Sequence, residues 1–117
     1  MAWKWDDRFQ TVLAEFKVDN KARIHNALEH RLDRVWDSSN IETAPEVVQT
    51  IISSFGGIMP GQLLLTSDPG RDALVYCAWW PWGNGETISI RLAPFYQKTS
   101  DADKAGQTQQ LKEWFGI

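Results

Sequence analysis

A hairpin signal in the second half of the chain constrains the fold more than any other feature. Residues 73–80 are rich in side chains that favour strands, and residues 87–93 alternate apolar with polar. Between them lies Asn84-Gly85, the dipeptide preferred in two-residue hairpin turns. The sequence therefore predicts two antiparallel strands joined by a tight turn.

The hairpin divides its side chains between two faces. A two-residue turn pairs Trp79 with Ile90, Cys77 with Leu92, and Trp80 with Ser89. Pro81 cannot donate a ladder hydrogen bond, which favours a longer loop. A four- or six-residue loop would shift the pairing but keep its parity, so the division of the side chains between the two faces stays the same. We expect one face to pack on helices: Val75, Cys77, Trp79, Ile88, Ile90 and Leu92. The other face carries Tyr76, Ala78, Trp80, Thr87, Ser89 and Arg91, with Trp82 at its rim.

The second face offers the best candidate for a binding surface. Tyrosine, tryptophan and arginine dominate interface hot spots, so Tyr76, Trp80, Trp82 and Arg91 are the predicted protein-binding residues. A structural interpretation stands beside this one, in which the C-terminal helix simply covers the face. The leucines at positions 63, 65 and 74 would then share its far end.

The first half of the chain shows helical spacing. Phe9, Val12, Leu13 and Phe16 recur at i, i+3, i+4 and i+7, which predicts a helix over residues 6–17. A second helix is expected over about 19–37. Thr43-Ala-Pro-Glu46 resembles a capping box for a third, which Gly56-Gly57 would end.

These elements together predict the fold class. The expectation is an α+β domain spanning 1–117, with three N-terminal helices, then a three-stranded antiparallel β-meander. Its first strand would lie at residues 63–66, and a short C-terminal helix, carrying Leu111, Trp114 and Phe115, would pack on the sheet.

Composition excludes several classes of function. The 117 residues carry a net charge of −3, with 12 basic and 15 acidic side chains, so the sequence lacks the basic stripe of a duplex-binding protein. No apolar run is long enough to cross a bilayer, and no secretory signal is visible. Cys77 is the only cysteine. We therefore expect a cytoplasmic protein with no nucleic-acid or membrane partner.

The groups that could carry catalysis or bind a metal have structural interpretations that the sequence favours. Cys77 is predicted on the core face, where a thiol is normally inert. His25, Glu29 and Asp33 recur at helical spacing, but on a side expected to face solvent, and no other histidine or cysteine completes a ligand set. No catalytic residue, metal or cofactor is predicted.

Two functional hypotheses follow. The first is a non-enzymatic protein-interaction module (an accessory, adaptor, chaperone or inhibitor/immunity-type protein) that presents the aromatic–arginine face to a protein partner or to a second copy of itself. The alternative is a small-molecule-binding protein or small enzyme with a pocket between sheet and helices, marked by convergent polar groups near Trp36, Trp79 or Trp80. Seven tryptophans, more than a core of this size needs, fit either hypothesis.

Overall fold

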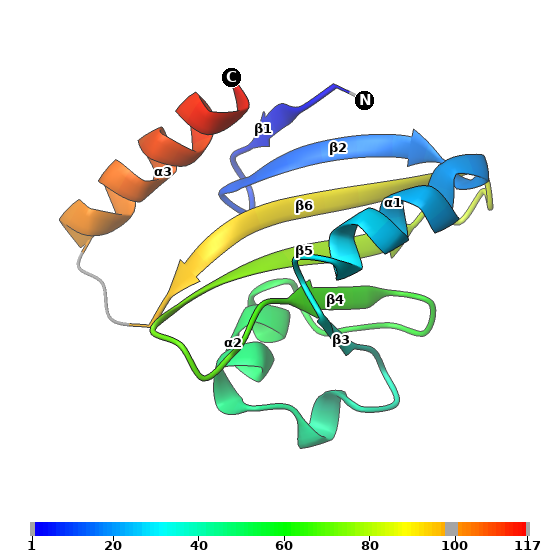
Figure 1. Ribbon diagram of the computed structural model, residues 1–117, viewed down its shortest axis with the longest axis horizontal. Coiled ribbons are helices and arrows are strands. Elements are labelled where there is room, and N and C mark those ends of the chain that lie inside the picture. Colours follow the sequence, from blue (N-terminus) through cyan, green and yellow to red (C-terminus); the bar gives the residue numbers. More distant parts are fainter. Residues whose placement is uncertain (1, 98–100, 117) are drawn as a thin grey trace.

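A six-stranded antiparallel sheet forms the body of the protein (Figure 1). The computed structural model describes residues 2–97 and 101–116, apart from the side chains of residues 101–104. The spatial order of the strands is β1-β2-β6-β5-β4-β3. The strands are β1 (Lys4–Asp6), β2 (Thr11–Lys17), β3 (Arg34–Trp36), β4 (Leu63–Thr66), β5 (Ala73–Pro81) and β6 (Thr87–Tyr96). The helices are α1 (Lys21–Glu29), α2 (Glu46–Ser54) and α3 (Asp101–Phe115), with short 3₁₀ turns at Val18–Asn20 and Ile41–Thr43.

The predicted hairpin forms the centre of the sheet as β5 and β6. Trp79 pairs with Ile90 and Cys77 with Leu92, which is the register expected for a two-residue turn. The Trp82 amide donates to the carbonyl of Thr87, so the loop itself covers residues 83–86. The division of the hairpin into two faces is therefore confirmed.

The predicted helix over 6–17 is wrong, because this segment forms β1, a turn and β2. Its helical spacing coexists with a second pattern in which Val12, Ala14 and Phe16 are buried while Glu15 and Lys17 are exposed. That alternation suits a strand with one buried face. Pairing with β6 decides between the two patterns, since tertiary contacts routinely override local propensity.

The predicted second helix is also wrong in extent. It stops at Glu29, and the chain then forms β3 at the sheet edge, where Val35 pairs with Leu65. The Trp36 indole donates to the Thr66 hydroxyl at 3.2 Å. Val35 and Trp36 thus pair with β4 and do not belong to the apolar side of α1.

Helix α2 lies where the third helix was predicted, but its start differs. Pro45 occupies the N-cap, and the Thr43 hydroxyl donates to the carbonyl of Asn40 rather than capping the helix. The predicted capping box is therefore wrong. Gly56 and Gly57 do end the helix, with φ of +86° and +105° in the left-handed region that favours glycine.

The helices cover both faces of the sheet. α1 lies across β5 and β6 on one face (Figure 1), where Ile24 and Leu28 pack on a core that includes Cys77 and Trp79. α2 covers the opposite face. That second core contains Val47, Val48, Ile51, Ile52, Leu64, Leu74, Tyr76, Ala78 and Ala93. Leu63 and Leu65 pair with Trp79 and Cys77, so they lie on the first face rather than the predicted second one.

The predicted C-terminal helix forms as α3, but it covers only part of the second face, where Leu111 joins the same core as Tyr76 and Ala93. It lies beside β1, at the sheet edge opposite β3 (Figure 1). Leu111 is buried, Phe115 packs on Trp3 with ring centroids 4.9 Å apart, and the Lys112 ammonium lies 4.7 Å from the centre of the Trp5 ring. The predicted three-helix, three-strand order is thus replaced by a six-stranded sheet with helices on both faces and at one edge.

Candidate functional site

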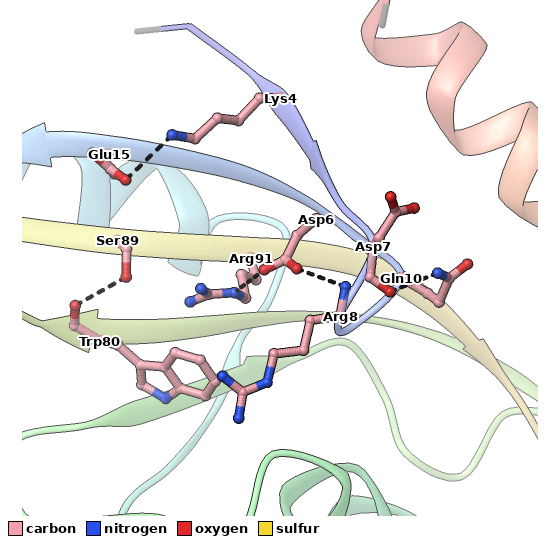
Figure 2. Close-up of polar contacts among 9 residues, drawn as sticks. All are labelled: Lys4, Asp6, Asp7, Arg8, Gln10, Glu15, Trp80, Ser89 and Arg91. Carbon is pink, nitrogen blue, oxygen red and sulfur yellow. Dashed lines mark hydrogen bonds and ion pairs between the residues drawn. The ribbon is translucent and has the colours of Figure 1, made fainter.

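The turn between β1 and β2 builds one side of the candidate site. An Asp6 carboxylate oxygen accepts the Arg8 amide N–H at 3.0 Å, and the Gln10 side chain donates to the carbonyl of Asp7 at 2.8 Å (Figure 2). Gln10 takes a left-handed conformation, with φ of +56°. Aspartate favours such turns because its side chain bonds the backbone two residues later. The turn thereby holds Arg8 and Phe9 in defined positions beside the sheet.

An ion pair joins this turn to the central hairpin. Arg91 Nε donates to Asp6 Oδ2 at 2.8 Å, and the two side chains are only 16% and 13% exposed (Figure 2). Burial alone would raise the pKa of the Asp6 carboxyl. The hydrogen bond and charge of Arg91, with the amides of Arg8 and Phe9, outweigh burial and lower that pKa. Asp6 therefore stays ionised and fixes Arg91.

Aromatic rings hold the arginine side chains from the other side. The Arg91 guanidinium lies 4.7 Å from the centre of the Trp80 ring and 5.3 Å from that of Phe9. The Arg8 guanidinium lies 4.9 Å from the centre of the same Phe9 ring. We call Asp6, Arg8, Phe9, Trp80 and Arg91 the aromatic–arginine cluster. It brings two guanidinium groups to one phenylalanine ring, and the Asp6 carboxylate pairs with one of them, that of Arg91.

The cluster retains unused hydrogen-bond donors. Within the part of the chain that the structure describes, Arg91 makes its side-chain hydrogen bond through Nε alone, and the Arg8 guanidinium makes none. A guanidinium fork matches the two oxygens of a carboxylate or phosphate. The arrangement can therefore bind an anionic group while Asp6 keeps Arg91 in place.

The four predicted binding residues do not all meet. Trp80 and Arg91 stack in the cluster, and Trp82 lies two residues after Trp80, just beyond the end of β5, and is 44% exposed. Tyr76 is only 6% exposed, and burial raises the pKa of its hydroxyl. Phe55, which directly follows α2, packs on both Tyr76 and Trp80, with ring centroids 5.8 and 4.8 Å away. The predicted surface is thus partly core.

Sequence reasoning missed Asp6, Arg8 and Phe9, because it assigned them to a helix. The useful signal was the alternation of residues 11–17, which places a strand after Asp6-Asp7 and makes those aspartates turn residues.

A second feature is a groove of about 440 Å³ between β6, α2, α3 and the β1–β2 turn. Its lining is Phe9, Gln10, Ser54, Tyr76, Ala93, Pro94, Phe95, Tyr96, Ala105, Gln107, Thr108 and Leu111. None of Trp36, Trp79 and Trp80 lines it, so this is not the pocket position that the sequence predicted.

The remaining chemical candidates lie elsewhere. Cys77 is fully buried, and burial raises the pKa of its thiol. His25 meets the edge of the Trp79 ring with centroids 5.3 Å apart, and its Nδ1 lies 3.4 Å from a Glu29 carboxylate oxygen. Asp33 lies beyond the end of α1. Among the described residues, no three histidine, cysteine or acidic side chains form a group able to hold a metal ion.

Comparisons with protein families, curated proteins and solved structures find no match to this chain. In residues 2–97 and 101–116, none of the helices combines the length and apolar character needed to cross a membrane.

Proposed function

We propose that this chain is a non-enzymatic protein-interaction module of the cytoplasm, which binds an acidic segment of a protein partner at the aromatic–arginine cluster. One observation carries the proposal. Arg91 is held by Asp6 through Nε and by Trp80 on its face, while its terminal nitrogens make no hydrogen bond within the described chain.

A fixed guanidinium favours binding because its ordering is already complete. A mobile arginine loses side-chain entropy when it binds a partner, and this loss offsets much of the favourable binding free energy of the contact. The ion pair with Asp6 and the contact with Trp80 impose that order in the unbound protein. A carboxylate that approaches Arg91 then gains charge-assisted hydrogen bonds at a smaller entropic cost.

The surroundings of Arg91 fit a peptide rather than a bare ion. Arg8 is exposed and adds a second positive charge beside Phe9. Trp82 is exposed and lies two residues after Trp80, just beyond the end of β5. A partner segment with acidic and apolar residues would contact both kinds of surface, and tryptophan with arginine is the pairing enriched at hot spots.

Peptide selection tests the proposal without knowledge of the natural partner. A random twelve-residue peptide library is displayed on phage and selected on the wild-type protein. Because the cluster offers cationic donors, the selected peptides should be rich in aspartate and glutamate. Their binding to Arg8→Glu is then compared with their binding to Arg31→Glu. Arg31 is equally exposed but lies after α1, and it makes no side-chain bond within the described residues.

We expect Arg8→Glu to weaken binding of the acidic peptides at least tenfold, because it turns an attraction into a repulsion. Arg31→Glu changes the net charge equally and should alter binding by less than about twofold. Equal losses in both variants, or peptides without acidic residues, would contradict the proposal.

Light scattering tests the homodimer: if the partner is a second copy, wild type has twice the monomer mass and Arg8→Glu is monomeric.

A further inference from the structure

The groove beside Tyr76 adjoins the aromatic–arginine cluster and shares only Phe9 with it. Phe9 lines the groove and also contacts the cluster arginines, so its ring forms the wall between the two. Phe55 strengthens that wall, since its ring centroid lies 4.8 Å from that of Phe9. A volume of about 440 Å³ falls within the range of small-molecule pockets, roughly 300–1,000 Å³.

The Tyr76 hydroxyl is the polar feature that points to a ligand. Tyr76 is 94% buried, and its hydroxyl makes no hydrogen bond within the described residues. Of the described residues, only Thr11 has a buried side-chain oxygen that is both sealed from solvent and without a partner. The Tyr76 hydroxyl therefore opens onto the groove that the residue lines. A bound molecule with one hydrogen-bonding group would bond this hydroxyl in place of water, while its apolar part is removed from solvent against the groove.

The lining also restricts the charge of the ligand. The described residues around the groove comprise aromatic, aliphatic and neutral polar side chains, with no aspartate, glutamate, lysine or arginine among them. An ionised group would lose its hydration there without gaining an opposite charge. Phe9, Phe95 and Tyr96 provide aromatic surface for a flat molecule.

We propose that this groove binds an uncharged aromatic small molecule, which exchanges a hydrogen bond with the Tyr76 hydroxyl while its rings pack among Phe9, Phe95 and Leu111. The site shares the Phe9 ring with the surface assigned to the protein partner, but neither Arg8 nor Arg91 lines it. Its occupation and the binding of acidic peptides are therefore separate properties.

The test uses 2-naphthol, which is neutral at pH 7, as the probe, and 2-naphthoate as its anionic counterpart. Amide chemical shifts of the ¹⁵N-labelled protein are followed during each titration. We expect 2-naphthol to shift the amides of Tyr96, Thr108 and Leu111 in a saturable way. 2-Naphthoate should bind this groove at least tenfold more weakly. Shifts confined to Arg8 and Arg91 with 2-naphthoate report on the aromatic–arginine cluster, not on the groove.

Two variants test the contacts. Tyr76→Phe keeps the ring and should weaken 2-naphthol binding about five- to tenfold, the effect of one hydrogen bond. Its melting temperature should not fall, because the wild-type hydroxyl has no partner to lose among the described residues. Thr108→Phe fills the groove and should abolish binding, whereas Gln110→Phe, on the opposite side of α3, should leave it unchanged.

Several outcomes overturn the proposal. One is the absence of groove shifts up to the solubility limit of 2-naphthol. Another is equal groove affinity for the neutral and the anionic probe. A third is Tyr76→Phe binding 2-naphthol as tightly as wild type, and a fourth is binding that survives Thr108→Phe. None of these outcomes bears on peptide binding at Arg8 and Arg91, so the two proposals fail separately.

Discussion

Replacing Asp6 by asparagine removes the negative charge beside Arg91 with little change in volume. The ion pair is short, at 2.8 Å, and its two side chains are 13% and 16% exposed. Exposed pairs contribute about 0–1 kcal/mol, and breaking a fully buried pair costs about 3–5 kcal/mol. This pair lies between those limits, and asparagine keeps an acceptor for the Arg8 amide. We therefore expect Asp6→Asn to lower the free energy of unfolding by about 2 kcal/mol at pH 7, near the value for a hydrogen bond to a charged group.

The pH dependence of this loss identifies its cause. The pKa of Asp6 is lower in the folded protein than its ordinary value of 3.8, so the unfolded chain binds the proton more readily in acid. The stabilisation by ionised Asp6 is complete above that ordinary value and disappears as the pH falls through the lowered one. The difference in stability between wild type and Asp6→Asn should therefore be largest near neutral pH and shrink towards pH 3 and below.

Urea denaturation followed by tryptophan fluorescence measures the difference at each pH, and a loss of 2 kcal/mol corresponds to a fall in melting temperature of about 8 °C. Asp33→Asn is the matched control. Asp33 pairs with Arg34 at 3.2 Å, but the two side chains are 66% and 47% exposed, so the expected loss is below about 0.5 kcal/mol. Equal losses in the two variants, or an Asp6→Asn loss that persists unchanged in acid, would refute the reasoning.

Three further predictions concern stability and reactivity. Thr11→Val should keep or raise the free energy of unfolding, by up to about 1 kcal/mol, because the buried Thr11 hydroxyl has no partner within the described residues; a clear loss in urea denaturation would show that it has one. Gly57→Ala should cost about 1–2 kcal/mol, because φ is +105° there, while Gly83→Ala, at a position without positive φ, should cost less than about 0.5 kcal/mol in the same assay. Cys77 should resist iodoacetamide in the native protein and react fully in urea, as mass spectrometry would show; rapid native alkylation would contradict its complete burial and its raised pKa.

The hairpin was predictable because its determinants are local. Asn84-Gly85 specifies a turn, and the period-two alternation of 87–93 specifies a strand and its faces. The pairing of Trp79 with Ile90 follows from these two facts alone. The end of α2 was predictable for the same reason, since Gly56-Gly57 takes the left-handed conformation that helix ends commonly use.

The outer strands were not predictable in this way. β3 is three residues long, and it exists because Val35 and Trp36 find partners in β4, about thirty positions further on. β2 likewise depends on β6, more than seventy residues away. Contacts at such separation are not visible in the local sequence, and the alternation of residues 11–17 is ambiguous because the apolar spacing of the same segment also fits a helix.

The wrong prediction of a helix over residues 6–17 also explains why the sequence pointed to only part of the candidate site. The hairpin prediction identifies Trp80 and Arg91, but these two residues alone would form only an aromatic surface with a mobile arginine. Asp6 and Phe9 turn that surface into a site, since the first fixes Arg91 through Nε and the second stacks beside it. A helix over 6–17 would have placed Arg8 on the side opposite to Asp6, because residues two positions apart do not face each other on a helix. The turn after β1 instead brings Asp6 and Phe9 to Arg91 of β6, with Arg8 beside Phe9, so the proposed function of the hairpin face depends on the segment whose fold was hardest to predict.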